Sequence, residues 1–253
     1  MQLVVSWSAA DPDAPAGDPY WANVVLLAHG DGGTGSTTFT DSSSYAHTMT
    51  PKNGATQDAI YKKFGVSSIQ VSTGRPGYTY LTVPAAGSEF SFGAGVDFTI
   101  EMWLRPFSTD VADFSFILGK DNNSVQRGWN FYINKTNGNL IFFINPTSGA
   151  GTALTASGNF PGTYSGQWVH VAATRSGGDL RLFVNGQVVA SASGVGYAVN
   201  NPSGPLVIGG LWNGSAVATA LKFLGHLDDV RITNGVARYT SAFTVPAEAF
   251  PDS

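Results

Sequence analysis

Short runs of alternating apolar and polar residues recur along the chain from Tyr20 onward. In the segment FTIEMWLRP, residues 98–106, alternation assigns the side chains to two faces. One face carries Phe98, Ile100, Met102 and Leu104, and the other carries Thr99, Glu101, Trp103 and Arg105. The continuous apolar run NVVLLAHG, residues 23–30, is typical of a buried strand, and no segment has the period of a convincing amphipathic helix. The pattern therefore predicts an all-β protein.

Glycine-containing turns divide these runs into hairpins. The segment WNFYINKTNGNLIFFIN reverses at Asn137-Gly138, and WVHVAATRSGGDLRLFVNGQVVASA reads as a three-stranded meander with turns at Gly177-Gly178 and Asn185-Gly186. Asn-Gly and Gly-Gly suit two-residue hairpin turns because both positions accept positive φ. Many short strands without an internal repeat predict one antiparallel sandwich of two sheets over residues 20–253.

Residues 1–19 differ from the rest and predict an extended N-terminal arm. The segment ADPDAPAGDP is rich in Pro and Asp, which exclude a helix or a central strand. Before it stand four apolar residues that suit an assembly contact: Leu3, Val4, Val5 and Trp7. The hypothesis is that this arm adds to a sheet edge or fills a groove on a neighbouring subunit, the alternative being that it folds back on its own domain.

Composition narrows the function classes. The chain has 253 residues, of which 43% are hydrophobic and 12% charged, with a net charge of −4. This charge gives no electrostatic reason to expect nucleic acid or an anionic membrane as a partner. The chain has no cysteine, so disulfides and thiolate zinc sites are excluded. We expect no signal peptide and no membrane insertion, because no basic start or long apolar run is present.

Several segments, taken in order, resemble one known family. LLAHGDG, TTFTDSS, DFTIEMWLRP, WVHVAATRSGGDLRLFVNGQ and GHLDDVRITNGVARYT resemble the concanavalin A-like, laminin-G-type jelly-roll domains, especially those in virion proteins of tailed bacteriophages. The resemblance spans residues 18–251. It implies two antiparallel sheets packed face to face, with the N- and C-terminal parts close together. It also implies binding of glycans or proteins, often near calcium, although some relatives are glycosidases and the fold alone does not decide.

Two adjacent aspartates interrupt the strand GHLDDVRI, residues 225–232. Asp is depleted in strands, and a buried carboxylate needs a partner. Alternation places the two on opposite faces of the strand. If this strand pairs with FTIEMWLRP, a charge ladder satisfies the four side chains. The predicted pairs are Glu101 with Arg231 and Asp229 with Arg105.

A calcium site is the alternative role for the remaining aspartates. Asp31 and Asp41 bracket a loop rich in Gly, Ser and Thr, and Asp228 would add a carboxylate from the other face of its strand. Calcium takes six to eight oxygen ligands from carboxylates and carbonyls. The competing interpretation is that Asp31 and Asp41 cap turns, as Asp does before Gly or Ser. No other cofactor is expected.

Loop tryptophans are the candidates for glycan binding. Trp212, in GGLWNGSA, lies beside Asn213 in a predicted loop, and Trp129 follows Arg127. An exposed indole stacks on a sugar ring, and amide or charged groups bind its hydroxyls. The competing interpretation is that a loop Trp packs under a neighbouring loop or at a protein interface.

Three functions follow, in order of preference. The first is a non-enzymatic phage virion protein, structural or adhesive. Its expected location is the virion, assembled in the bacterial cytoplasm. Its expected partners are other virion proteins or copies of itself, joined through the arm, and host cell-surface polysaccharide. The second is a free-standing carbohydrate-binding module associated with a glycan-active enzyme. A glycosidase is third, because catalysis on this fold needs two paired carboxylates. The only glutamates, Glu89, Glu101 and Glu248, are scattered.

Overall fold

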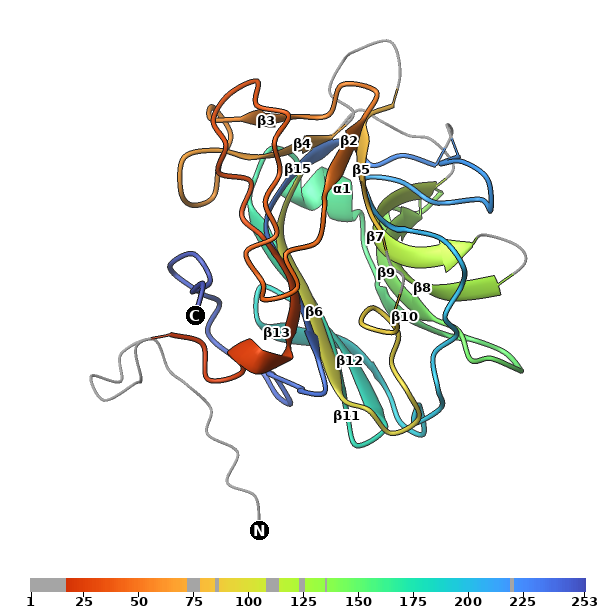
Figure 1. The fold of residues 1–253 in the computed structure, drawn as a ribbon. Helices are drawn as coiled ribbons and strands as arrows, with labels where there is room; N and C mark the ends of the chain where they lie inside the picture. The colour runs from red at the N-terminus through yellow and green to blue at the C-terminus, as the bar shows by residue number, and fades with distance from the viewer. Residues whose placement is uncertain are drawn as a thin grey trace.

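The computed structural model describes residues 17–71, 78–84, 87–107, 114–122, 126–134, 136–218 and 221–253. In these residues the strands form two antiparallel sheets packed face to face, with a core between them (Figure 1). The predicted all-β jelly-roll sandwich is confirmed. No helix in the described part of the chain has the length and apolarity needed to cross a membrane.

The first sheet has eight strands within the described residues. Its order is β13 (Gln187–Ala192), β12 (Asp179–Val184), β11 (Val169–Ser176), β6 (Phe98–Pro106), β15 (Gly225–Asn234), β4 (Ser68–Val71) and β3 (Thr56–Asp58), and β1 (Val24–Ala28) also pairs with β15. Strand β15 is therefore bonded to β6, β4 and β1, which come from the first half of the sequence.

The second sheet has seven strands in the part of the chain that the structure describes. Its order is β10 (Thr152–Ala156), β9 (Asn139–Ile144), β8 (Gln126–Asn134), β7 (Phe114–Asn122), β14 (Leu206–Ile208), β5 (Tyr80–Val83) and β2 (Thr50–Lys52). A 3-10 turn, η1 (Trp21–Asn23), precedes β1, and a one-turn helix, α1 (Phe160–Tyr164), follows β10. The sequence pattern missed α1, which is capped by the Asn159 side chain accepting a 3.0 Å hydrogen bond from the N–H of Gly162.

The predicted alternation in β6 is confirmed. Phe98, Ile100, Met102 and Leu104 all lie in the core between the sheets. The predicted turns at Asn185-Gly186 and Gly177-Gly178 are confirmed as well, since these residues have φ of 48°, 75°, 56° and 91°. Positive φ at both positions matches the right-handed twist of the flanking strands. At the predicted Asn137-Gly138 turn only Gly138 has positive φ, 70°, and the strands pair from Asn134 to Asn139, so this connection is longer than two residues.

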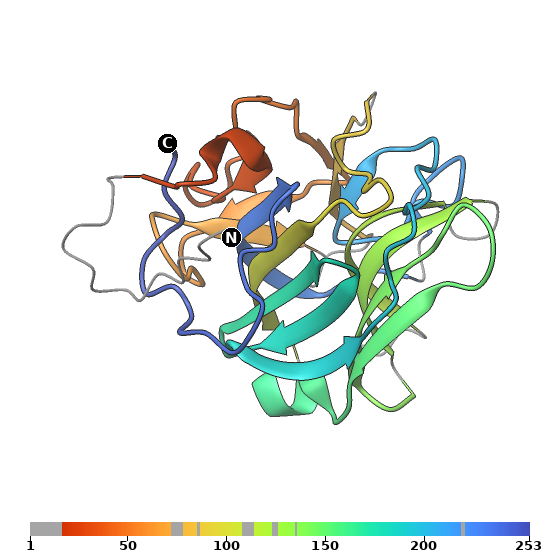
Figure 2. The ribbon, with the colours of Figure 1, turned by 90° about the horizontal axis from the view of Figure 1, so that it is seen from below.

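The two ends of the described chain lie together, as expected. The N–H of Asp18 donates to the backbone carbonyl of Ser253, and both views show the C-terminus beside the start of the red segment (Figures 1 and 2). Asp18 is buried against the domain, although the sequence pattern places it in the predicted arm of residues 1–19. The apolar arm residues Leu3, Val4, Val5 and Trp7 lie outside the described residues, so the arm hypothesis stays a prediction.

Candidate ligand-binding site

Trp212 lies in a small hairpin that follows β14 of the seven-stranded sheet. It pairs with Val217, and the N–H of Ala218 donates to the carbonyl of Leu211 at 2.8 Å. The side-chain oxygen of Asn213 accepts hydrogen bonds from two backbone N–H groups of the turn, at 3.0 and 3.2 Å. The amide therefore closes the hairpin, and the indole of Trp212 is held half-buried beside it.

A groove of about 750 Å³ opens beside this indole. We call it the Trp212 groove, and its lining comprises Lys52, Tyr80, Thr82, Pro84, Ser203, Gly204, Pro205, Trp212, Ser215 and Ala216. Strands β2 and β5 supply one side, and the loops coloured light blue in Figure 1 supply the other. Among the described residues, two aromatic rings, several hydroxyls and one cationic side chain thus face one concave surface. A few polar groups on a mostly apolar concave surface are typical of a small-ligand site.

A buried lysine binds the segment 202–204, which forms part of one wall of the Trp212 groove. Lys120 donates hydrogen bonds from Nζ to the carbonyl oxygens of Pro202 and Gly204, the second at 3.0 Å. Burial lowers the pKa of Lys120 to about 8. Trp212 packs directly on this wall, because a Cβ added at Gly204 would lie 2.8 Å from the indole Cδ1. The position of the ring therefore depends on Gly204 having no side chain.

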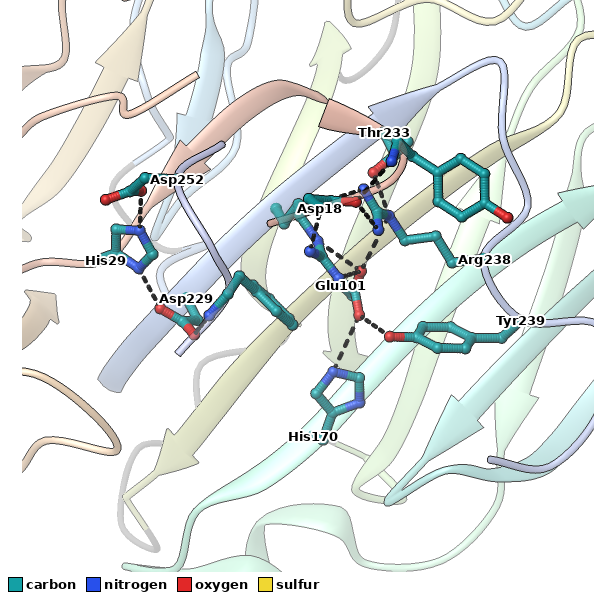
Figure 3. A network of polar contacts seen from close by, with 12 residues as sticks. Asp18, His29, Glu101, His170, Asp229, Thr233, Arg238, Tyr239 and Asp252 are labelled. Atoms are coloured by element: carbon teal, nitrogen blue, oxygen red, sulfur yellow. Dashed lines mark hydrogen bonds and ion pairs between the residues drawn. The ribbon is translucent and has the colours of Figure 1, made fainter. Parts of the chain in front are cut away.

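A charged network occupies the outer side of the eight-stranded sheet, under the C-terminal segment (Figure 3). Arg231 and Glu101 face each other in the register of β15 and β6, and Arg231 donates to Glu101 Oε1 from Nε at 3.0 Å and from Nη2 at 2.8 Å. Arg231 Nη1 and the guanidinium of Arg238 donate to the carboxylate of Asp18. The hydroxyl of Tyr239 donates to Glu101 Oε2 at 2.9 Å.

The charged groups of this network already bind one another, so few of their hydrogen-bonding atoms remain for a ligand. A second cavity of about 450 Å³ lies above the network, between Tyr20 and the segment 239–251. The two guanidiniums at its base, Arg231 and Arg238, already donate to Asp18, Glu101 or Thr233. The Trp212 groove is therefore the better candidate site among the described residues.

Comparisons with known proteins now identify the family. A laminin-G-type family model, described as the concanavalin A-like lectin/glucanases superfamily, matches residues 75–238. The chain belongs to this superfamily. A comparison with curated proteins finds no match for the sequence.

Solved structures share this lectin-like fold at low sequence identity. The binding domain of Paraclostridial Mosquitocidal Protein 1 gives a TM-score of 0.63 at 19% identity, covering 89% of this chain and 50% of that chain. The receptor binding domain of botulinum neurotoxin D gives 0.61 at 13%, covering 87% and 51%. The botulinum neurotoxin serotype D ligand binding domain in complex with N-acetylneuraminic acid gives 0.62 at 14%, covering 87% and 49%. This chain thus spans about half the length of those structures, and the likeness shows the fold alone.

The second predicted glycan-binding pair in this lectin-like domain was Trp129 with Arg127, and the prediction is wrong for Trp129. Trp129 is fully buried in the core, where its indole N–H donates to the carbonyl of Phe90 at 2.7 Å. The strand alternation that places Phe131 in the core also turns Trp129 inward. Arg127 instead pairs with Asp121 at 2.9 Å, at the start of β8.

The predicted pair of Asp229 with Arg105 is also wrong. Asp229 accepts a 2.8 Å hydrogen bond from the N–H of Phe250 and also binds His29, whereas Arg105 lies 3.9 Å from the ring of Tyr61. The cause is a β-bulge in β15, where the register with β6 shifts by one residue between Asp228 and Arg231.

The same bulge overturns the expectation that Asp228 and Asp229 point to opposite faces. Leu227 and Val230 both lie in the core, so two residues instead of one separate these inward side chains. Asp229 has φ of 48°, a left-handed conformation that Asp tolerates better than most residues. Both aspartates therefore point away from the core, each toward a different loop.

Asp229 and His29 form a contact that the sequence analysis missed. His29 lies between the carboxylates of Asp229 and Asp252 (Figure 3). Burial alone would lower the pKa of His29, but the two carboxylates outweigh it and raise the pKa to about 9. A protonated His29 therefore ties the C-terminal segment to β15. The sequence around His29 did not indicate this role, because both of its carboxylate partners lie at least 200 residues away.

The three predicted calcium ligands each accept backbone hydrogen bonds. Asp31 accepts from the N–H of Val66 at 2.7 Å, and Asp41 accepts from the N–H of Leu27 at 3.0 Å. Asp228 accepts from two N–H groups of the loop that follows β3. Among the described residues, no group of three or more His, Asp or Glu side chains is arranged to hold a metal ion. Calcium binding therefore stays a prediction. Asp41 caps its own turn, since it also accepts from the N–H of Ser43 at 3.0 Å, whereas Asp31 and Asp228 bind a loop that is distant from them in sequence.

Proposed function

We propose that the chain is a non-enzymatic adhesion and structural domain of a bacteriophage virion, which binds a host-surface glycan in the Trp212 groove. The observation that carries the glycan proposal is the pairing of Trp212 and Tyr80 with hydroxyl groups and Lys52 on one concave surface. An aromatic face accepts the apolar side of a sugar ring, while hydroxyls and an ammonium group bind its polar edge.

The comparisons support a binding role without locating a site. The solved structures of this fold include a toxin domain in complex with N-acetylneuraminic acid and another whose cell entry depends on two ganglioside molecules. Two of the similar structures are a toxin binding domain and a toxin receptor binding domain, which favours binding over catalysis for a domain of the same architecture. The virion setting rests on the resemblance of the segments quoted above.

A glycan array with matched variants tests the proposal. Trp212→Ala removes the indole, and Gly204→Ala displaces it, because the new Cβ would contact the ring at 2.8 Å. Tyr45→Ala is the control, since Tyr45 is an aromatic residue with 51% exposure outside the groove. Loss of a central aromatic contact typically weakens binding by about 2 kcal/mol, or roughly thirtyfold.

We expect both groove variants to lose glycan retention and Tyr45→Ala to keep it, with all three melting close to the parent chain. A parent chain that retains no glycan rules out the lectin function. If Trp212→Ala instead collapses the melting temperature, Trp212 is a structural residue.

The alternative is a free-standing carbohydrate-binding module associated with a glycan-active enzyme. Mass spectrometry of purified phage particles separates the two, because a virion protein yields peptides of this chain at a fixed ratio to the other particle proteins. Its absence from the particles, together with glycan binding, would favour the module.

A further inference from the structure

The loop between β3 and β4 exposes an unusual amount of apolar surface. Ile60 is 78% exposed, Val66 54% and Tyr61 40%. In the described part of the chain these are three of the seven large hydrophobic residues that are exposed. Isolated exposed apolar residues are common, but a cluster of them in one loop marks an interaction site. We call residues 59–66 the β3–β4 loop.

This loop is held in place by three carboxylates of the domain body. Asp58 accepts a 2.7 Å hydrogen bond from the N–H of Ile60 at the loop's start. Asp228 accepts from two N–H groups in its second half, at 2.7 and 3.2 Å, and Asp31 accepts from two at its end, at 2.7 and 3.3 Å. A loop ordered before binding loses little conformational entropy when it binds.

The base of the loop is packed as well. The guanidinium of Arg105 lies 3.9 Å from the centre of the Tyr61 ring. Lys63 Nζ lies 4.0 Å from the Trp103 ring, and Phe64 meets the same ring edge-on at 5.8 Å. Since these side chains tie the base to β6, the exposed apolar residues stand on a fixed support.

Charged side chains of both signs lie at this loop, which itself carries Lys62 and Lys63. Lys62 is exposed, and so is Asp31, which follows β1 and accepts from the N–H of Val66 at the end of the loop, whereas Lys63 Nζ lies over the Trp103 ring. Neither Lys62 nor Asp31 has an ion-pair partner among the described residues. A two-fold contact places one surface against itself, so each cation of one copy can meet the anion of the other. A surface of mixed sign is, by contrast, poorly suited to an anionic membrane, which attracts clustered basic residues.

We propose that the β3–β4 loop is the centre of a contact with a second copy of this chain, in which Ile60, Tyr61 and Val66 pack together and Lys62 of each copy pairs with Asp31 of the other. The carboxylates that hold the loop explain why apolar residues are displayed here instead of folding into the core. The proposal is independent of glycan binding, because none of these residues lines the Trp212 groove.

Sedimentation velocity and native mass spectrometry of the full chain test the proposal. The parent chain is compared with Ile60→Asp, Lys62→Glu and the control Val189→Asp. Val189 is an exposed apolar residue of β13, 41% exposed, so it controls for adding a carboxylate to an apolar surface position. Melting curves of all four proteins establish that each is folded.

We expect the parent chain to form a species of twice the chain mass of 26.5 kDa. Ile60→Asp should weaken association at least about tenfold, as truncating or charging a central contact residue does. Lys62→Glu should weaken it and reduce its dependence on salt, whereas Val189→Asp should leave it unchanged.

Three results overturn the proposal. One is a parent chain that stays monomeric at about 100 μM, where a specific interface of micromolar affinity would be populated. Another is association that Ile60→Asp leaves unchanged. The third is a monomeric chain that floats with vesicles of phosphatidylcholine and phosphatidylserine and loses this property in Ile60→Asp, which would assign the loop to a membrane surface.

Discussion

Replacing Arg231 with Met tests the buried charge network most directly. The substitution removes two hydrogen bonds to Glu101, at 3.0 and 2.8 Å, and one to Asp18 at 3.0 Å. Met keeps most of the aliphatic volume, so the change is mainly electrostatic. Glu101 is fully buried, and its other neighbours of basic type lie farther away than Arg231, with His170 Nε2 at 3.3 Å and Arg238 Nε at 3.9 Å, so neither replaces the two hydrogen bonds of Arg231 without rearrangement.

The expected loss follows from burial. Removing one partner of a buried ion pair costs about 3–5 kcal/mol, because the remaining charge is left without compensation. For a domain of this size, each kcal/mol lowers the melting temperature by roughly 2–4 °C, so the fall should be about 6–20 °C. Since domains are typically stable by about 5–15 kcal/mol, the variant should still fold at room temperature.

Urea unfolding monitored by tryptophan fluorescence gives the free energy of unfolding. Arg181→Met is the matched control, because Arg181 pairs with Asp179 at the surface, where ion pairs contribute only about 0.2–1 kcal/mol. The double variant Glu101→Met/Arg231→Met should recover much of the loss, since it removes both buried charges. A loss below about 1 kcal/mol in Arg231→Met would refute the reasoning, because the network would then behave as a surface pair.

The pH dependence gives a second measurement of the same network. Burial alone would raise the pKa of Glu101, but Arg231 and His170 outweigh it and hold the pKa well below its usual value of 4.5. A lowered pKa in the folded state gives stability that is present above pH 4.5 and is lost as the pH falls toward the folded-state pKa. The parent chain should lose stability steeply on acidification below that pH, and Arg231→Met should show a flatter profile.

Three further predictions concern the aspartates and the arm. Burial raises the pKa of Asp228 to about 8. The stability that this carboxyl group contributes in its protonated form is therefore fully present below about pH 4 and is lost as the pH rises toward 8. In urea unfolding, the Asp228→Asn variant should therefore become more stable relative to the parent chain as the pH rises from 5 to 8. A difference in unfolding free energy that does not change with pH would contradict the raised pKa. If Asp31 or Asp41 binds calcium, the melting temperature should rise with calcium concentration, and identical melting in chelator and in millimolar calcium would show that there is no significant site. Deleting residues 2–17 should leave the domain folded and abolish assembly through the arm, whereas the contact through the β3–β4 loop should remain. Native mass spectrometry with melting curves checks both, and an unfolded product, or one whose assembly is the same as that of the parent chain, would contradict the arm hypothesis.

Much of the fold could be predicted because its signals are local. Alternation in β6 identified the inward residues, and Asn-Gly and Gly-Gly identified the tight turns. The same alternation could have corrected the interpretation of Trp129, since Trp129 and Phe131 are two residues apart in one strand and share a face. Trp212 differs because glycines and Asn213 flank it, which is typical of a loop.

The bulge in β15 could not be predicted in the same way. A bulge shifts the register by one residue, and nothing in GHLDDVRI shows where the extra residue lies until the partner strand is known. A predicted pairing that assumes strict alternation through the bulge, such as Asp229 with Arg105, is therefore wrong. Arg231 and Glu101 still meet, because they lie beyond the bulge, where alternation resumes.

The two adjacent aspartates now have a physical explanation. Without the bulge, one of them would point into the sandwich core, where an unpaired carboxylate is costly. With it, Asp228 holds the β3–β4 loop, and Asp229 holds His29 and the C-terminal segment through the N–H of Phe250. Each carboxylate thereby fixes a segment that is distant in sequence and has little regular structure of its own. The bulge is what lets one strand attach two such segments to the outer side of its sheet.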